Sequence, residues 1–275
     1  TATDATLATQ DEAFSYDANG NRIGTNLATG PHNRLTSDAN FTYLYDGEGN
    51  VIRRTDKTGF GQGSYTQFAY DHRNRLVTAE NFSSGAVIQR RVTYSYDAEG
   101  RLAARKFEEL GVGPFLDPLT QEYYVLDGDQ RVLTYDGETN QLNRRNTWGV
   151  LGELVIDEVF GGAGAGSRWA VTDHLGTVTD LINMVGNEII EHREYDAFGA
   201  IDAAFDQSGS AVAVTNLKTP IGFTGQVFDS QTGLSYHAAR WYDPATGRFM
   251  SEDPIGEGAN HYRYAGNDPV NFYDP

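Results

Sequence analysis

Apolar and polar residues alternate over short stretches of this chain, and a turn signal separates one stretch from the next. In residues 92–106, VTYSYDAEGRLAARK, the side chains of Val92, Tyr94 and Tyr96 alternate with polar ones. A period of two residues is typical of a β-strand with one buried face. The strand runs into the pattern Asp-x-x-Gly, in which Asp favours the start of a type I turn and Gly the positive φ of the following bulge. The pattern therefore predicts a β-hairpin with a four-residue loop.

The same unit returns along the chain. A Tyr-Asp pair occurs eight times, with tyrosines at positions 16, 45, 70, 96, 135, 195, 242 and 273. A period in the twenties that drifts indicates an array of structural units. One hairpin is too small to be stable by itself, so neighbouring hairpins must pair edge to edge. We predict an all-β fold in which the hairpins form a curved sheet or spiral shell. Tyr and Leu should pack one face of it, with Arg, Thr and Asn on the other.

Composition narrows the function further. The 275 residues include 16 Tyr and 31 Gly, which suit pleated surfaces and tight turns. The net charge of −17 disfavours nucleic acids and anionic membranes as partners, because both require a basic surface. The absence of Cys excludes disulfides and Cys-ligated zinc. No apolar run approaches the length of a membrane span, and the first ten residues, TATDATLATQ, show no signal-peptide pattern.

The repeats YDANGNRI, YDGEGNVIRR and YDHRNRLV resemble the YD repeats of bacterial Rhs proteins, toxin-complex C subunits and animal teneurins. From Trp169 onward, the segments WAVTDHLGTVTDLINMVGNEIIEHREYDAFG, GFTGQVFDSQTGLSYHAARWYDPATGRFMSEDPIG and AGNDPVNFYDP resemble the Rhs-associated core domain, which follows those repeats. The Gly-rich segment FGGAGAGSRW at residues 160–169 is the best internal boundary. We therefore expect a YD-repeat shell segment in residues 1–160 and an Rhs-associated core domain, which caps the shell, in residues 161–275.

In that family the hairpins coil into a hollow β-shell around a toxin. The resemblance implies that this chain is part of such a shell and that the core domain seals it. The implied partners are a C-terminal toxin cargo, an upstream shell segment of the same polypeptide, and a secretion or toxin-complex delivery machinery. The implied location is outside the cell or at a cell surface, reached through a bacterial export system. The alternative is a non-enzymatic adhesion or scaffold protein, teneurin-like or wall-associated, whose core domain cuts nothing.

The resemblance also implies self-cleavage by an aspartyl-protease-like mechanism, in which one ionised carboxylate activates a water and one neutral carboxyl supplies a proton. The carboxylates at the matching motifs are Asp253 and Asp274, with Asp268 as a third candidate. Arg248 and Arg240 are candidates for orienting a carboxylate or holding the strand that carries the cleavage site. Two departures alter the loop after the first motif. Glu257 stands where the family usually has Leu, and GAN replaces Gly-Gly at residues 258–260.

Other interpretations of these residues compete with the catalytic one. Asp-Pro pairs commonly end strands and cap turns, and we assign Asp243 and Asp117 to that role. The run DANGN from Asp17 resembles the start of a calcium loop, but position 12 of that loop is an Ala, so the hairpin turn is the better explanation. We expect no cofactor and no metal site. The tryptophans at positions 148, 169 and 241 suit cross-strand packing more than a sugar-binding platform.

Overall fold

The structure, a computed structural model, confirms the all-β fold predicted from the alternation of residues. It describes residues 12–111, 116–162, 164–256 and 258–274, without the side chains of residues 60 and 116–118. The TATDATLATQ segment, Glu257 and Pro275 lie outside the described residues. None of the described helices is long and apolar enough to cross a membrane. Helical structure in this part of the chain consists of 3-10 turns at Pro31–Asn33, Gly59–Gly61, Val214–Asn216, Phe223–Gly225 and Ala265–Asn267.

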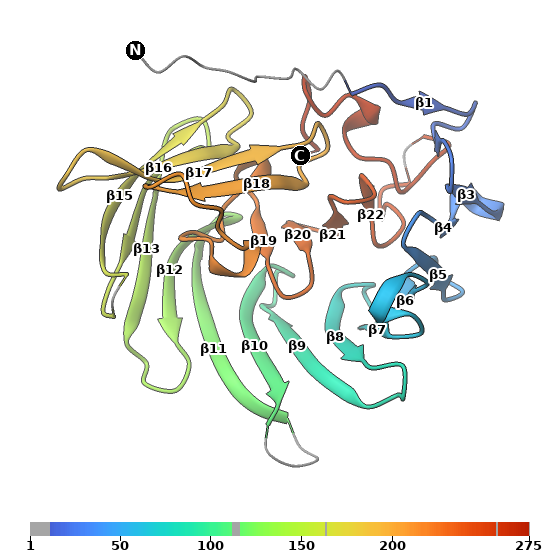
Figure 1. Cartoon of the computed structure of the whole chain (residues 1–275), viewed down its shortest axis with the longest axis horizontal. Helices are drawn as coiled ribbons and strands as arrows, with labels where there is room; N and C mark the ends of the chain where they lie inside the picture. Colours follow the sequence, from blue (N-terminus) through green and yellow to red (C-terminus); the bar gives the residue numbers. More distant parts are fainter. Residues whose placement is uncertain (1–11, 112–115, 163, 257, 275) are drawn as a thin grey trace.

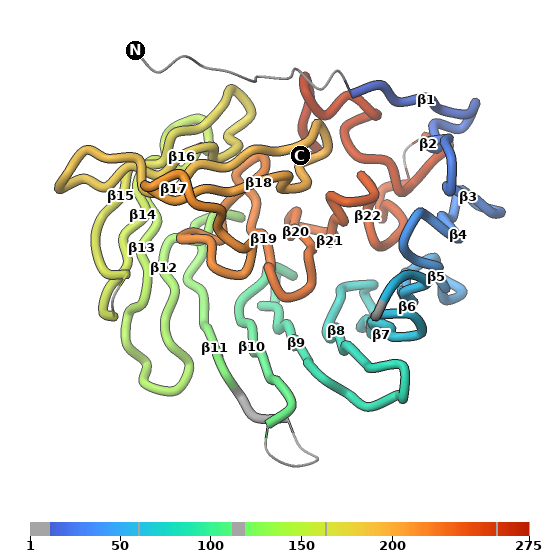
Figure 2. Tube along the Cα trace, in the orientation of Figure 1, coloured from blue at the N-terminus to red at the C-terminus, as the bar shows by residue number. Residues whose placement is uncertain are grey.

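Sixteen antiparallel strands form one sheet, which we name the wall, and each strand pairs with its neighbours in the sequence. This order confirms that the repeats are hairpins paired edge to edge. The wall curls in space without closing into a barrel by strand pairing (Figure 1, Figure 2). Its strands are β3 (Ala28–Thr29), β4 (Leu35–Ser37), β5 (Phe41–Tyr45), β6 (Val51–Asp56), β7 (Tyr65–Tyr70), β8 (Leu76–Phe82), β9 (Ile88–Tyr96), β10 (Leu102–Leu110), β11 (Leu116–Asp127), β12 (Gln130–Asp136), β13 (Leu142–Trp148), β14 (Leu154–Val159), β15 (Gly166–Thr172), β16 (Val178–Asn183), β17 (Glu188–Tyr195) and β18 (Ile201–Asp206).

Two smaller sheets complete the fold. The hairpin of β1 (Ser15–Tyr16) and β2 (Arg22–Ile23) precedes the wall. After the wall, the described part of residues 211–274, which we name the C-terminal segment, contains a four-stranded antiparallel sheet. This sheet lies inside the curve of the wall, and the lower ends of the central wall strands extend past it (Figure 1). Its strands are β19 (Val227–Asp229), β20 (Leu234–His237), β21 (Arg240–Asp243) and β22 (Arg248–Phe249).

The aspartate of the Tyr-Asp pair builds the hairpin turn. Asp46 Oδ1 accepts backbone hydrogen bonds from Glu48 at 3.0 Å and Asn50 at 2.9 Å. Gly49 has φ +88°, and the strand register shifts at Leu44 and Tyr45, as expected for a bulge after the turn. The same two hydrogen bonds recur in the other turns of this type, from Asp17, Asp71, Asp97, Asp173 and Asp196. The turn thus depends on a carboxylate and a left-handed residue at fixed spacing.

In the wall, the tyrosine of a Tyr-Asp turn ties its hairpin to the one before it. The Tyr70 hydroxyl donates to the Val51 carbonyl at 3.0 Å, and the Tyr96 hydroxyl donates to the Leu76 carbonyl at 2.6 Å. In the divergent repeat, Trp148 takes this role and donates from Nε1 to a carbonyl of β12 at 2.9 Å. These partners lie 17 to 20 residues upstream. A side chain that recurs once in each repeat can therefore reach back to the preceding hairpin. This bond gives a physical reason for the recurrence of Tyr-Asp.

Three of the eight Tyr-Asp pairs do not build such a turn. Tyr135 and Asp136 end β12, where their hairpin loop lies at the opposite end of the wall from the turns at Asp97 and Asp173. Tyr242 lies on β21 of the C-terminal segment, and Tyr273 follows the last 3-10 turn. The sequence pattern therefore overcounts the wall turns.

The prediction for the two faces of the sheet is only half right. The inner face does carry the main apolar cluster, in which Tyr43, Phe68 and Leu76 pack with Tyr236 and Trp241 of the C-terminal segment. However, arginines also lie on this face, contrary to the prediction. Five of them each have a carboxylate partner, which offsets the high cost of burying a charge. These arginines are Arg54, Arg105, Arg144, Arg168 and Arg193.

The wall continues through the predicted boundary between residues 160 and 161. Strands β14 and β15 pair across it, with Ile156 opposite Trp169. Sheet order then runs on to β18, so the change in architecture comes after Asp206. The Gly-rich segment follows β14 and runs into β15, which begins at Gly166.

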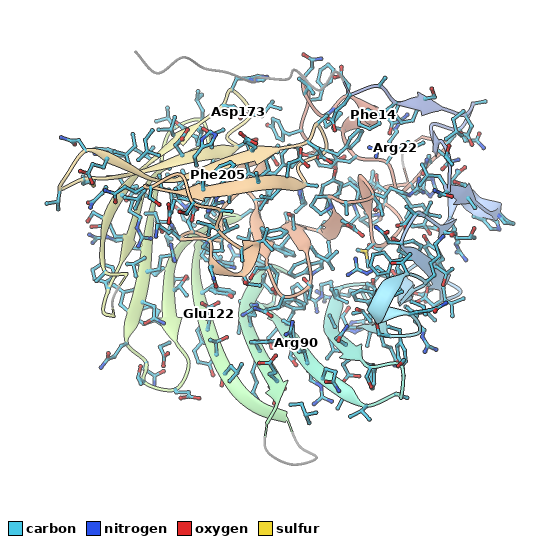
Figure 3. The ribbon with its side chains drawn as sticks, viewed as in Figure 1. Phe14, Arg22, Arg90, Glu122, Asp173 and Phe205 are labelled. Carbon is cyan, nitrogen blue, oxygen red and sulfur yellow. The ribbon has the colours of Figure 1, made fainter. Side chains whose placement is uncertain are left out.

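Side chains join the first hairpin to the last wall hairpin, a contact that we name the seam. The Arg22 guanidinium carbon lies 4.1 Å from the ring centre of Phe14 and 4.2 Å from that of Phe198. Glu12 accepts a hydrogen bond from the Ala197 backbone at 2.7 Å. Figure 3 shows Phe14 and Arg22 at the top of the molecule, near the C-terminal residues. The first hairpin and the last hairpin of the wall therefore meet through cation–π and hydrogen-bond contacts.

Candidate active site

Asp253 and Asp274, the two aspartates of the Asp-Pro motifs, both contact Arg240. Arg240 Nη2 is 3.1 Å from Asp274 Oδ1 and 3.9 Å from Asp253 Oδ2. Arg240 belongs to β21, whereas Asp253 follows β22 and Asp274 follows the last 3-10 turn. The fold thus gathers three of the five predicted site residues from separate elements.

Backbone contacts fix these three side chains. Asp253 Oδ1 accepts the Ile255 N–H at 2.8 Å, and Asp274 Oδ2 accepts the Ala265 N–H at 3.3 Å. Arg240 donates from Nη1 to the His261 carbonyl at 3.1 Å, and its guanidinium carbon lies 3.5 Å from the ring centre of Phe249. The Asp253 contact is also the one expected of a turn-capping Asp-Pro, so both interpretations of Asp253 are compatible with the geometry.

Arg240 is the common charged partner of the two aspartates. Burial lowers the pKa of Arg240, while the charges of Asp253 and Asp274 oppose that shift.

His237 is the cross-strand neighbour of Arg240 and is neutral. His237 is opposite Arg240 in the β20–β21 pair, and its two ring nitrogens are buried without a hydrogen-bond partner among the described residues. Burial, and then the charge of Arg240, lowers the pKa of His237 to about 3. Its ring packs edge-to-face against Tyr242 and Phe249. His237 is therefore an uncharged packing residue at neutral pH.

The other two predicted residues lie apart from this cluster. Arg248 donates to Asn21 Oδ1 at 3.3 Å and to the Asn33 carbonyl, so it holds the early hairpins against β22. Asp268 accepts from Asn271 Nδ2 at 2.8 Å and caps the turn that follows it. Neither residue has an ion pair with Arg240 or with the other two aspartates among the described residues.

Sequence reasoning missed Glu252, the neighbour of Asp253. Its carboxylate is 3.2 Å from Arg34 Nη2, 3.2 Å from the Tyr262 hydroxyl and 3.7 Å from His261 Nδ1. It therefore links the loop after β22 to the early wall. The only local signal is an acidic residue before an Asp-Pro pair, and that does not specify a partner more than 200 residues away.

The remaining candidates have structural contacts. Asp243 Oδ1 accepts the Ala245 N–H at 3.1 Å, which fits its assignment as a turn residue, while the Asp117 side chain is outside the described part. Asp17 uses its carboxylate for its own hairpin turn. Trp241 donates to the Tyr96 hydroxyl at 2.9 Å, whereas Trp169 is 41% exposed on the wall. Among the described residues there is no group of three metal-ligating side chains.

Comparison with known proteins identifies the family. The family model described as Teneurin YD-shell matches residues 2–116 and 163–270. Double-stranded DNA deaminase toxin A of Burkholderia cenocepacia is 30% identical over 96% of this chain and 19% of its own length. Salivary gland surface protein 1 of Aedes aegypti is 27% identical over 84% of this chain and 6% of its own. Probable deoxyribonuclease RhsA of Dickeya dadantii is 28% identical over 88% and 16%, respectively.

The chain spans less than a fifth of the length of each of these relatives. The family model matches most of this chain, and the matched residues include parts of both the wall and the C-terminal segment. A sheet built from consecutive hairpins, several of them closed by a Tyr-Asp turn, is consistent with that match. This chain belongs to the YD-shell family, which bacterial Rhs proteins share with the teneurins.

Proposed function

We propose that this chain forms part of a hollow β-shell that encloses a toxin polypeptide, and that its C-terminal segment closes the shell and severs the cargo. Family membership and a toxin among the relatives support the enclosing role. The partners in this proposal are a C-terminal toxin cargo and an upstream shell segment of the same polypeptide. A bacterial secretion system or toxin-complex machinery would deliver the assembly outside the cell or to a cell surface.

Contacts between the C-terminal segment and the hairpin turns support the sealing role. The Tyr262 hydroxyl donates to the Gly49 carbonyl at 2.7 Å, and the Tyr242 hydroxyl donates to the Phe198 carbonyl at 2.7 Å. These turns belong to hairpins near opposite ends of the wall but lie at the same end of its strands. A segment anchored at both would cover that end of the curl.

Self-cleavage rests on one observation, the contact of Arg240 with both Asp253 and Asp274. In the proposed step, one ionised aspartate takes a proton from water, whose oxygen attacks the scissile carbonyl carbon. The other aspartate, when neutral, gives its proton to the leaving nitrogen as the peptide bond breaks. Arg240, which contacts both carboxylates, would hold the pair in place.

The experiment is expression of the chain with the residues that follow Pro275 in its gene and a reporter domain after them. Intact mass spectrometry should find a fragment that ends shortly after Pro275. Asp253→Asn and Asp274→Asn should each abolish that fragment. Asp268→Asn is the matched control and should leave cleavage intact, because Asp268 contacts Asn271 instead. Cleavage that persists in both Asp253→Asn and Asp274→Asn removes the aspartyl mechanism.

A second candidate is an adhesion or scaffold role without cleavage. The salivary gland surface protein among the relatives and the exposed ring of Trp169 favour it. Absence of the fragment in the unmutated protein supports this candidate. Trp169→Ala would then reduce retention on immobilised carbohydrate, whereas Trp148→Ala is unsuitable as a probe because Trp148 has a structural hydrogen bond.

A further inference from the structure

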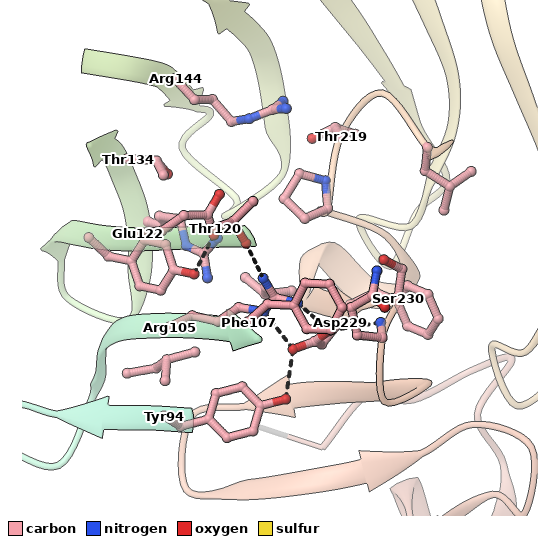
Figure 4. A pocket seen from close by; sticks show the side chains of 18 of the residues that line it. Tyr94, Arg105, Phe107, Thr120, Glu122, Thr134, Arg144, Thr219, Asp229 and Ser230 are labelled. Carbon is pink, nitrogen blue, oxygen red and sulfur yellow. Dashed lines mark hydrogen bonds and ion pairs between the residues drawn. The ribbon is translucent and has the colours of Figure 1, made fainter. Parts of the chain in front are cut away.

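A cavity of about 360 Å³ lies between the inner face of the central wall and the C-terminal segment. Strands β9 to β13 form one side of it, and residues 214–231 form most of the other. In Figure 4, Glu122, Thr134 and Arg144 lie on wall strands, with Thr219 and Ser230 across from them. The cavity is separate from the Arg240 cluster.

One arginine of this cavity has no carboxylate partner among the described residues. Arg105 pairs with Asp229, and Arg144 pairs with Asp157. Arg131, which is 5% exposed, instead lies with its guanidinium carbon 3.5 Å from the ring centre of Tyr124. A cation–π contact compensates a buried cation only in part, since it satisfies none of its N–H donors.

Thr134 is a second buried polar residue in the cavity lining. Thr134 is 3% exposed, and its hydroxyl has no hydrogen-bond partner within the described part of the chain. Thr134 and Arg131 both lie on β12. The register of the β11–β12 pair shifts between Val125, which is opposite Leu133, and Leu126, which is opposite Arg131. The shift explains why two residues three positions apart are both buried on the inner face. A buried hydroxyl without a partner costs about 1–3 kcal/mol, so an occupant that accepts its hydrogen bond is favoured.

The remaining lining mixes apolar and polar residues. Its polar members include Glu122, which accepts the Tyr124 hydroxyl, and the ion pair of Arg105 and Asp229. Its apolar members include Phe107, Leu119, Val214, Leu217 and Trp241. We propose that the cavity binds an organic carboxylate with an apolar body, whose carboxylate pairs with Arg131 and accepts the Thr134 hydroxyl. Guanidinium and carboxylate match in a bidentate geometry, and the apolar body fills the rest of the cavity.

Two sources share this chemistry. One source is an acidic side chain beside an apolar residue in the enclosed polypeptide. This source rests on the proposed function. The other is a free small carboxylate. The peptide N-acetyl-Leu-Glu-amide represents the first source and benzoate the second, while benzamide has the shape of benzoate without its charge.

The test is isothermal titration calorimetry of the whole chain with these three probes. We expect the peptide or benzoate to bind, and benzamide to bind at least tenfold more weakly. Arg131→Gln should weaken binding roughly tenfold or more, and Thr134→Val by a smaller factor. Arg145→Gln is the matched control, because Arg145 pairs with Glu158 and is 52% exposed. Binding of the peptide alone identifies a polypeptide source, and binding of benzoate alone identifies a small molecule.

Three results would overturn the proposal: no binding of either carboxylate, equal binding of benzamide, or unchanged affinity in Arg131→Gln. If Arg131→Gln does not fold, Arg131→Lys keeps the charge, loses the bidentate geometry and should bind with intermediate affinity. The cleavage of the extended chain described above does not involve this cavity. A failure here therefore leaves the self-cleavage experiment interpretable, and the reverse also holds.

Discussion

Arg105 of the wall and Asp229 of the C-terminal segment form a bidentate ion pair across 124 residues of sequence, with Nε–Oδ2 and Nη2–Oδ1 distances of 2.7 and 3.0 Å. The Tyr94 hydroxyl donates to the same carboxylate at 2.7 Å. Burial acts to raise the pKa of Asp229, but the charge and hydrogen bonds of Arg105 outweigh it and the net shift is downward. This pair is one of several polar links between the wall and the C-terminal segment.

Asp229→Asn should destabilise the protein by about 3 kcal/mol or more, because it leaves the buried Arg105 without its counter-charge. Urea unfolding measures this loss. Glu158→Gln, which breaks the exposed pair with Arg145, should cost less than about 1 kcal/mol. Equal losses in the two variants would contradict a docking role for the buried pair.

The tyrosine hydroxyls of the repeats should contribute measurably to the wall. Tyr70→Phe removes the hydrogen bond to the Val51 carbonyl and should lower the free energy of unfolding by about 1 kcal/mol. Tyr96→Phe should cost more, because its hydroxyl also accepts from Trp241. Tyr123, 42% exposed, is the control position, and Tyr123→Phe should change stability little. A loss at Tyr123 as large as at Tyr96 would argue against the proposed hairpin-to-hairpin bond.

Local chemistry explains what could be predicted of the fold. The turn at Asp46 is complete within five residues, so its carboxylate and the glycine at positive φ are visible in the sequence. The hairpin at Tyr135 shows where this reasoning fails. There the wall-end turn is the tighter loop around Gly128, and Tyr135-Asp136 moves to the opposite end. A pattern of residues specifies a turn but not which end of the sheet it occupies.

The candidate site could be predicted only in part, for a different reason. Asp253 and Asp274 were found by resemblance, and their common contact with Arg240 depends on the path of three separate segments. Nothing near Arg248 indicates that it would contact Asn21 rather than an aspartate. Four of the inner-face arginines are similar, because their carboxylate partners lie on other strands or in the C-terminal segment, whereas Arg193 pairs with Glu191 on its own strand. Long-range ion pairs have no periodic signature in one sequence.

A methyl group at Gly49 should disturb the docking of the C-terminal segment. A Cβ there would lie 2.3 Å from Glu252 Oε1, so Gly49→Ala should displace the side chain that contacts Arg34 and Tyr262. Gly128→Ala is the control, because Gly128 also has a positive φ but its Cβ would meet nothing within 4 Å. Both variants should lose about 1 kcal/mol from backbone strain. Only Gly49→Ala should also speed hydrogen exchange in residues 249–264, and equal exchange in the two would refute the prediction.

The seam should weaken as pH rises. Burial first, and then the charges of Glu12 and Asp202, raises the pKa of Asp196 to about 6. An aspartate in the unfolded chain titrates near 3.9, so the folded state binds this proton more tightly. The resulting stabilisation is complete below about pH 4 and is lost as pH rises through about 6. Thermal unfolding between pH 4 and pH 8 should show this decline.

Asp196→Asn should remove that pH dependence and be more stable than the unmutated protein at pH 8, since Asn still accepts the hydrogen bonds of Phe198 and Ala200. Asp97→Asn is the opposite case. Hydrogen bonds from the Arg101 backbone and side chain lower the pKa of Asp97, so its carboxylate stabilises the fold at neutral pH and its loss should destabilise it. If Asp196→Asn and Asp97→Asn shift the midpoint of unfolding at pH 8 in the same direction, the half-buried Asp196 is not what makes the seam sensitive to pH.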